Sequence, residues 1–334
     1  MRFAVLGAGS WGSSLAQVLL DNKHSVVIYD RNVETIKEIK EKKTNTKYFP
    51  SSVVLPSELE TTTDLKDAIE GAEGVVIAVP SAAYRSILEE IASLLDHKVY
   101  IVSCAKGYDQ QTEKRLSDTI REIIPSEMSY PIVSLIGPSH AEEVILRMLT
   151  CVTSTCLDLD TAKVIQSAFS NSYFRVYNNT DEIGAENAAA IKNVIAIASG
   201  IVAGLGYGDN TKAALITRGL AEILRFGQKE GGKITTYLGL TGIGDLMVTC
   251  TSLHSRNFQA GYKIGKDDGA EIFLKENKMT VEGLRTCKIV LDKAKKDGID
   301  MPVVKAVYDV LYNGCQPSKI VEQLMLRPLK NEFE

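Results

Sequence analysis

The sequence predicts an α/β domain, built on a doubly wound and mainly parallel sheet, followed by an all-α domain. Three observations support this fold class. Apolar strand segments alternate with helical segments through the first half of the 334 residues. A glycine-rich turn joins the first strand to the first helix. From about residue 182 the strand signals stop, and the pattern becomes mostly helical.

The first element is a buried strand at residues 2–6, and a glycine-rich turn follows it. The turn reads Gly7-Ala8-Gly9-Ser10-Trp11-Gly12, a G-x-G-x-x-G pattern that residues 13–20 continue as a helix. Backbone N–H groups and the positive helix end at such a turn can hold a diphosphate. A second strand at residues 24–29 supplies the context that makes this pattern specific. We therefore predict a Rossmann-like domain that binds a dinucleotide.

The rest of the first half continues the alternation of strand and helix. Predicted strands cover residues 74–80, 98–103, 132–136, 150–154 and 174–177, and predicted helices cover residues 33–43, 84–95 and 113–124. The strand at residues 74–80 ends at Pro80, which cannot donate to a sheet. Because helical crossovers join successive strands, the sheet is expected to be mainly parallel.

The second half is predicted to be helical. Its expected helices cover residues 186–202, 212–229, 257–263, 283–297 and 301–312. Pro302 suits the first turn of the last of these helices. We place the boundary near residue 180, so that residues 1–181 form the dinucleotide-binding domain and residues 182–334 form a helical substrate-binding domain.

Composition excludes several classes of protein. The net charge is −4 and no long basic run occurs, which gives nucleic-acid binding little electrostatic support. Six cysteines occur singly and only four histidines are present, so we expect no metal site and reduced thiols in a cytoplasmic protein. The chain starts directly with a strand, so we expect no signal peptide. Residues 188–205 are the longest apolar stretch and are predicted to form a buried helix rather than a membrane span.

Lys192 is the sharpest single candidate for chemistry, because it lies inside that apolar stretch. Burying a charged lysine is costly, and burial lowers the pKa of an ammonium group toward the range useful for proton transfer. A lysine that reaches the helix edge, or that pairs with a structural acid, is the alternative interpretation.

Two further segments offer polar groups. The turn Thr241-Gly242-Ile243-Gly244-Asp245 presents one carboxylate, which could orient a lysine, bind a substrate hydroxyl or simply cap a helix. His254-Ser255-Arg256-Asn257 places an arginine at an apparent helix start, where it could hold a phosphate or remain solvated on the surface.

Three residues follow strand ends on the edge where ligands bind in such sheets. Lys106 precedes Gly107, and Ser139 follows Gly137 in a turn that allows close backbone approach. Each could also belong to an ordinary turn. His140 comes next, and we interpret it as a packing or hydrogen-bonding residue rather than a base.

Together these motifs resemble the bacterial-type NAD(P)-dependent glycerol-3-phosphate dehydrogenases over nearly the whole chain. The motifs are Gly7 to Gly12, Ala78-Val79-Pro80-Ser81, Lys106-Gly107, Gly137-Pro138-Ser139 with Ala141-Glu142-Glu143, Lys192-Asn193, Gly242 to Leu246 with Thr249-Cys250, Ser255-Arg256-Asn257, and Val281-Glu282-Gly283. The resemblance implies reversible reduction of dihydroxyacetone phosphate to sn-glycerol 3-phosphate, which feeds glycerophospholipid synthesis. It also suggests a homodimer. In this family a phenylalanine often stands where this chain has His140.

The resemblance also assigns roles to residues. Lys192 becomes the proton donor to the ketone, and the acceptor in the reverse direction. The implied cofactor contacts are Gly7, Gly9, Ser10, Trp11, Gly12, Arg31, Lys106, Ala141, Arg256, Thr280 and Glu282. The implied substrate contacts are Lys106, Gly137, Ser139, Lys192, Asp245, Ser255, Arg256 and Asn257.

The end of the second strand leaves the choice of cofactor open between NAD and NADP. Asp30 stands where an acid usually holds the ribose hydroxyls of NAD, but Arg31 follows it and could bind the extra phosphate of NADP. Two rival functions also stay open: a related two-domain reductase acting on a hydroxy acid, and a nucleotide-sensing protein that has lost catalysis. The first would need no phosphate site, and the second would not need Lys192, Asp245 and Arg256 together.

Overall fold

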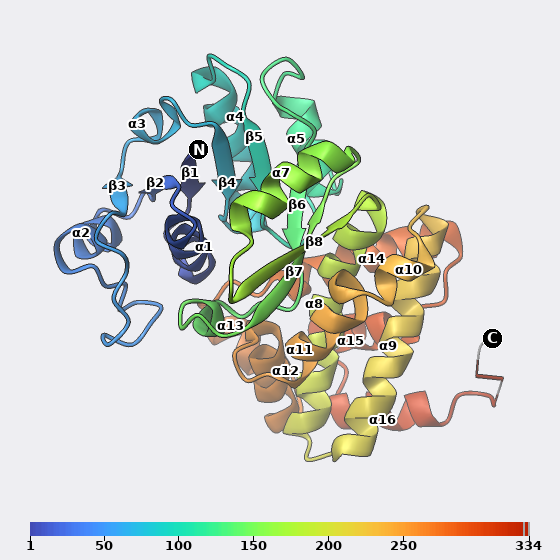
Figure 1. Ribbon diagram of the computed structural model, residues 1–334. Helices are drawn as coiled ribbons and strands as arrows, with labels where there is room; N and C mark the ends of the chain where they lie inside the picture. The colour runs from blue at the N-terminus through green and yellow to red at the C-terminus, as the bar shows by residue number, and fades with distance from the viewer. Residues whose placement is uncertain (330, 333–334) are drawn as a thin grey trace. The chain divides into compact units, whose positions relative to one another are not determined.

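A computed structural model, drawn in Figure 1, describes residues 1–329 and 331–332 of the chain. The chain packs as two compact units. The first unit holds Met1–Ala189 and Glu230–Asp245, and the second holds Ala190–Lys229 and Leu246–Glu334. The predicted domain boundary after residue 181 stays a prediction; it falls between strand β8 (Phe174–Asn179) and helix α8 (Glu182–Gly204).

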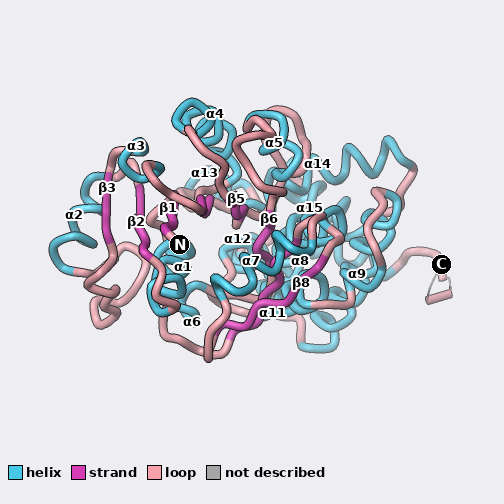
Figure 2. The backbone as a smooth tube through the Cα atoms, turned by 45° about the horizontal axis from the view of Figure 1, so that its top comes forward, coloured by secondary structure: helices cyan, strands magenta, loops and turns pink. Residues whose placement is uncertain are grey.

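The first unit is built on one eight-stranded sheet, and the predicted fold class is confirmed. The strand order is β3-β2-β1-β4-β5-β6-β7-β8, and Figure 2 shows it running from β3 at one end to β8 at the other. All neighbouring strands are parallel except β6 and β7. Besides β8, the strands are β1 (Arg2–Leu6), β2 (Ser25–Tyr29), β3 (Glu60–Thr62), β4 (Gly74–Ile77), β5 (Tyr100–Ser103), β6 (Val133–Ile136) and β7 (Thr150–Thr155).

Helices cover both faces of this sheet, which explains why its strands are apolar runs. Phe3 and Val5 pack into one core with Leu15, while Ala4 and Leu6 pack into another on the opposite face, because successive strand residues point to opposite faces. The helices of this unit are α1 (Ser10–Asp21), α2 (Val33–Lys42), α3 (Leu65–Ile69), α4 (Tyr84–Leu94), α5 (Leu116–Ile123), α6 (Ala141–Val144), α7 (Leu159–Phe169) and α10 (Ile234–Tyr237).

The second unit is helical, as predicted. Helices α8 and α11 (Asp245–Thr251) begin in the first unit and end in the second. The other helices of the second unit are α9 (Asp209–Lys229), α12 (Arg256–Lys266), α13 (Glu271–Glu276), α14 (Glu282–Asp297), α15 (Pro302–Tyr312) and α16 (Pro317–Met325). Pro302 opens α15, in agreement with the prediction.

Helix α8 is the apolar stretch that the sequence predicts to be buried. By length and composition it could cross a membrane, but 89% of its apolar window is buried inside the protein. Core helices of globular proteins pass the same test of length and hydropathy, so this helix is weak evidence for a membrane span.

The structure differs from the predicted elements at several short segments. The sequence prediction misses β3, α3, α6, α7, α10, α11, α13 and α16. It also starts α5 three residues too early. Arg115 forms an isolated bridge with Tyr108, and Glu113 has a φ of 58°, so the chain reaches helical geometry only at Leu116. Tertiary pairing thus overrides the helical propensity of this segment.

Candidate active site

The glycine turn of the first unit has the geometry that a dinucleotide requires. Gly7 has a φ of 106°, and a Cβ at Gly12 would lie 1.9 Å from the Gly7 carbonyl oxygen. A Cβ at Gly9 would meet nothing within 4 Å, so the backbone is open on that side. Among the described residues, no side chain caps the start of α1. The turn therefore leaves room and helix-end N–H groups for a diphosphate.

Two side chains brace this turn from outside the motif. The Ala8 N–H donates to Asp30 Oδ2 at 2.8 Å, and the Asn32 N–H donates to Asp30 Oδ1 at 2.9 Å. Asn45 Nδ2 donates to the Ala8 carbonyl at 2.9 Å and lies 3.0 Å from Ser13 Oγ. Asp30 therefore supports the turn with the same carboxylate that the sequence suggests for ribose. Asn45 lies in a loop with no motif, so the sequence offered no signal for it.

The other cofactor residues predicted in this unit lie around the same helix or at a strand end. Ser10 and Trp11 are the first two residues of α1, and Ser14 Oγ on the next turn donates to the Ala141 carbonyl at 3.0 Å. The structure thus brings Ala141 to the glycine turn's helix. Arg31 follows β2, is exposed and forms an ion pair with Glu90 of α4.

Lys106, Gly137, Ser139 and Asp245 form one cluster in the first unit. Lys106 Nζ lies 3.1 Å from Asp245 Oδ2 and 3.3 Å from the Gly137 carbonyl oxygen, to which Ser139 Oγ also donates at 2.9 Å. The Asp245 side chain is 1% exposed and that of Lys106 is 22% exposed. Since the carboxylate is buried and the lysine side chain is partly exposed, the pair holds a positively charged donor in one place.

Cys104, two residues before Lys106, does not contribute a nucleophile. Its side chain is buried, and this burial raises the pKa of the thiol to about 12. A protonated thiol is a poor nucleophile at neutral pH. Within the ranges that the structure describes, no group of three or more His, Cys, Asp or Glu side chains could hold a metal ion.

The second unit places Lys192 in a buried position with a defined partner. Lys192 is 3% exposed, and its Nζ lies 2.6 Å from Oγ1 of Thr249 on α11. The alternative in which the lysine reaches solvent at the helix edge is wrong. The sequence motif included Thr249, but no role was predicted for it.

A chain of amide contacts links the remaining residues of the second unit. Asn257 Nδ2 donates to Asn193 Oδ1 at 3.1 Å, and Asn257 Oδ1 accepts the Gly283 N–H at 2.9 Å. Asn193 follows Lys192 directly, and Gly283 follows the predicted cofactor residue Glu282. The structure therefore brings together the segments around residues 192, 257 and 282.

The start of α12 has the geometry predicted for it. Ser255 caps the helix, because its Oγ accepts the Phe258 N–H at 3.2 Å. Arg256 is the first helical residue and is exposed, whereas Asn257 is buried. Thr280 is exposed on the loop before α14. An exposed guanidinium at a capped helix start can meet a phosphate from solvent.

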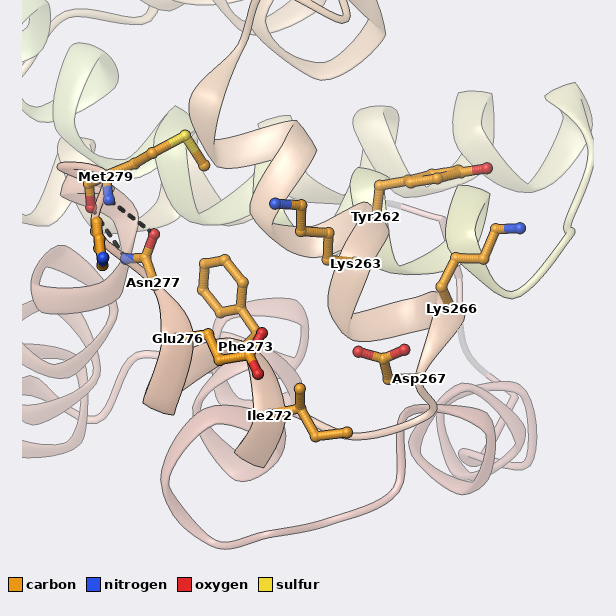
Figure 3. A pocket seen from close by; sticks show the side chains of 10 residues that line it. Tyr262, Lys263, Lys266, Asp267, Ile272, Phe273, Glu276, Asn277 and Met279 are labelled. Carbon is orange, nitrogen blue, oxygen red and sulfur yellow. Dashed lines mark hydrogen bonds between the residues drawn. The ribbon is translucent and has the colours of Figure 1, made fainter.

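A cleft with a volume of about 310 Å³ lies between α12 and α13 in the second unit (Figure 3). Figure 3 shows the side chain of Phe273 from α13 and those of Lys263 and Lys266 from α12 among the residues that line it. Asn277 holds the next turn, since its Oδ1 accepts the Met279 N–H at 3.0 Å. This cleft borders the loop that carries Thr280.

Comparisons with known proteins cover the whole chain. A family model described as the NAD-dependent glycerol-3-phosphate dehydrogenase N-terminus matches residues 2–162, and the model for the C-terminus of the same family matches residues 181–322. Curated relatives named glycerol-3-phosphate dehydrogenase (NAD(P)+) include one from Streptococcus thermophilus at 46% identity and one from Lysinibacillus sphaericus at 47%. Each alignment covers 100% of this chain and 98% of the relative.

Solved structures agree with these matches. The crystal structure of glycerol-3-phosphate dehydrogenase from Coxiella burnetii superposes with a TM-score of 0.91 at 33% identity, covering 98% of this chain and 99% of that chain. The match therefore extends through both units rather than through the nucleotide-binding fold alone.

Proposed function

This chain belongs to the family of NAD-dependent glycerol-3-phosphate dehydrogenases, and we propose how its residues carry out the reaction. The reaction is the reversible reduction of dihydroxyacetone phosphate to sn-glycerol 3-phosphate with NAD(P)H. One observation carries the proposed mechanism most directly: the ammonium of Lys192 is 3% exposed and lies 2.6 Å from the Thr249 hydroxyl.

Lys192 is the proposed proton donor. When bound, the nicotinamide supplies a hydride to the carbonyl carbon of the substrate. Negative charge then develops on the carbonyl oxygen, and a buried ammonium both stabilises that charge and donates a proton to it. In the reverse direction the neutral amine accepts the proton from the alcohol. Thr249 orients the amine, because its hydrogen bond with Nζ holds the Lys192 side chain in one rotamer.

Lys106 and Asp245 are proposed to position the substrate. A free lysine side chain samples many rotamers, whereas the Asp245 carboxylate and the Gly137 carbonyl hold Lys106 Nζ between them. Gly137 and Ser139 offer backbone and hydroxyl groups beside it. Arg256 and the capped start of α12, with Ser255 and Asn257, are suited to the phosphate group.

The dinucleotide is proposed to bind on the glycine turn. Gly7, Gly9 and Gly12 shape the turn, and Ser10 and Trp11 open the helix whose N–H groups face the diphosphate. Arg31 and Ala141 extend this site in the first unit. Thr280, Glu282 and Arg256 are the cofactor-binding residues proposed in the second unit. Either NAD or NADP can serve as cofactor. Arg31 is the candidate partner for the extra phosphate of NADP.

The cellular setting follows from the same family membership. We propose that the protein works in the cytoplasm as a homodimer and supplies glycerol 3-phosphate for glycerophospholipid synthesis. The buried cysteines Cys104, Cys156 and Cys287 are free thiols, which supports a reducing compartment.

Steady-state oxidation of NADH and NADPH tests the proposal directly. We expect turnover of dihydroxyacetone phosphate with at least one of the two cofactors, and little turnover of a phosphate-free keto acid. Turnover of the keto acid alone would instead identify a hydroxy-acid reductase. Binding of dinucleotide without turnover of either substrate would identify a sensing protein that has lost catalysis.

A further inference from the structure

The loop that carries Lys106 is anchored by a buried tyrosine for which the sequence predicts no role. Tyr108 lies two residues after Lys106 and is 3% exposed. Its hydroxyl donates a hydrogen bond to Asn187 Oδ1 on α8 at 2.8 Å. Gly107, between the two residues, has a φ of 154°, a backbone conformation that favours glycine.

The acceptor of this hydrogen bond is itself committed to it. Asn187 is 0% exposed, and its Nδ2 has no hydrogen-bond partner among the described residues. Without the Tyr108 hydroxyl, Asn187 Oδ1 would lose this hydrogen bond inside the protein, and a desolvated acceptor without a partner is costly. Burial, with Glu230 and Tyr237 nearby, raises the pKa of Tyr108 well above its usual value. Tyr108 therefore stays a donor throughout the working pH range.

Asp245, the ion-pair partner of Lys106, follows a turn that packs on a second buried tyrosine, Tyr237. Asp245 follows the turn Leu240–Gly244, and a Cβ at Gly242 would lie 2.0 Å from the Tyr237 carbonyl oxygen. This turn is thus packed directly on the Tyr237 backbone. Tyr108 and Tyr237 are thus two buried tyrosines, one on each side of the Lys106–Asp245 ion pair along the chain.

We propose that Tyr108 is a positioning residue: its hydrogen bond to Asn187 fixes the loop that carries Lys106 and so holds the ammonium against Asp245. The proposal rests on the proposed role of Lys106 in placing the substrate. A displacement of about 1 Å of a group that positions substrate is enough to reduce turnover strongly. Tyr108 acts only through Lys106 and touches no substrate.

Tyr108→Phe is the principal test, because it removes the hydroxyl and keeps the ring. We expect kcat/KM for dihydroxyacetone phosphate to fall about tenfold. In a Lys106→Ala background the same substitution should cause no further loss, since residues acting through one another are not additive. A full loss in that background would mean that Tyr108 acts independently of Lys106 and would overturn the proposal.

Chemical labelling gives a readout that needs no activity. The Lys106 side chain is 22% exposed, so acetic anhydride can reach its amine, and peptide mass spectrometry reports the labelling rate. Tyr108→Phe should raise that rate severalfold, whereas Tyr173→Phe, which removes a 2.6 Å hydrogen bond to Asp21, should not. If Tyr108→Phe does not fold, Asn187→Leu removes the same bond and is judged by the same labelling rate.

The kinetic assay and the labelling of Lys106 test the proposed function and the role of Tyr108 separately. A wild-type chain inactive on dihydroxyacetone phosphate would contradict the proposed function, while labelling would still decide whether Tyr108 holds Lys106. Unchanged labelling of Lys106 in both variants would overturn the positioning role even if the wild-type chain is fully active.

Discussion

Lys192 Nζ and Thr249 Oγ1 lie 2.6 Å apart in the second unit, where both residues are buried. A lysine held this way cannot be serving as a solvated surface charge. The hydroxyl fixes one rotamer of a flexible side chain, which is what proton transfer to a defined oxygen requires.

Replacing Lys192 tests this role. We expect Lys192→Ala to lower kcat by roughly 10²–10⁴-fold, the range typical for loss of a general acid. NADH binding, measured by fluorescence titration, should remain. Lys212→Ala is a suitable control in the same unit, because Lys212 pairs with Asp209 at the start of α9 and lies outside the proposed site. Unchanged kcat in Lys192→Ala would remove the lysine from the mechanism.

Thr249 should matter through the amine that it orients. Thr249→Val keeps the shape of the side chain and removes the hydroxyl, so we expect kcat to fall about tenfold, as for loss of one hydrogen bond to a charged group. Thr249→Ser restores the hydroxyl and should recover most of the activity. Equal activity in the Val and Ser variants would show that the hydroxyl has no part in turnover.

Cofactor preference is expected to depend on the ion pair between Arg31 and Glu90. The Glu90 carboxylate competes with an extra phosphate for the Arg31 guanidinium. Glu90→Gln should therefore raise kcat/KM for NADPH by about two- to fivefold, the effect of one exposed ion pair, and leave that for NADH nearly unchanged. Glu89→Gln removes an adjacent exposed carboxyl on α4 as a control. A similar gain in both variants would indicate a general effect of charge.

Asp30 is expected to support the binding of both cofactors rather than to select between them. Its carboxylate accepts N–H groups from Ala8 and Asn32, so Asp30→Asn should weaken binding of NADH and NADPH together by distorting the glycine turn. Isothermal titration with both cofactors measures this. A selective loss of NADH would show instead that the acid discriminates between the cofactors through the ribose.

Sequence reasoning reached the fold class because the decisive signals are local. An apolar strand such as residues 2–6, or a glycine-rich turn, can be recognised from a few consecutive residues. The antiparallel orientation of β7 against β6 could not be predicted in this way, because strand pairing depends on contacts between segments that are distant in the sequence. Short helices such as α3 and α6 carry too few residues for a clear period.

The same division holds within the candidate site. Lys192 was found because a charge inside an apolar helix stands out in the sequence. Asn45 was missed because it braces Ala8 from 37 residues away, and no local pattern marks such a contact. Asp30 was noticed, but its bond to the Ala8 N–H could only be seen once the strand and the turn were placed together.

The pH dependence of stability should reveal a buried carboxyl in the first unit. Glu186 Oε2 accepts from Ser117 Oγ at 2.7 Å, and Oε1 accepts from Ser134 Oγ at 3.0 Å. Burial, with the Glu182 carboxylate nearby, raises the pKa of Glu186 from 4.5 to about 7, although Arg115 acts in the opposite direction. Between these two pH values the folded state binds more protons than the unfolded state. The free energy of unfolding therefore falls as pH rises from about 4.5 to about 7.

Glu186→Gln should remove this part of the pH dependence, because an amide does not titrate. Chemical denaturation at pH 5 and pH 8 measures the free energy of unfolding of each protein. We expect the variant to gain roughly 3 kcal/mol relative to the wild type between the two pH values, from a pKa difference of about 2.5. Glu127→Gln, which removes an exposed carboxyl of the same unit, controls for loss of a charge. Parallel pH profiles of wild type and Glu186→Gln would contradict a raised pKa at this buried position.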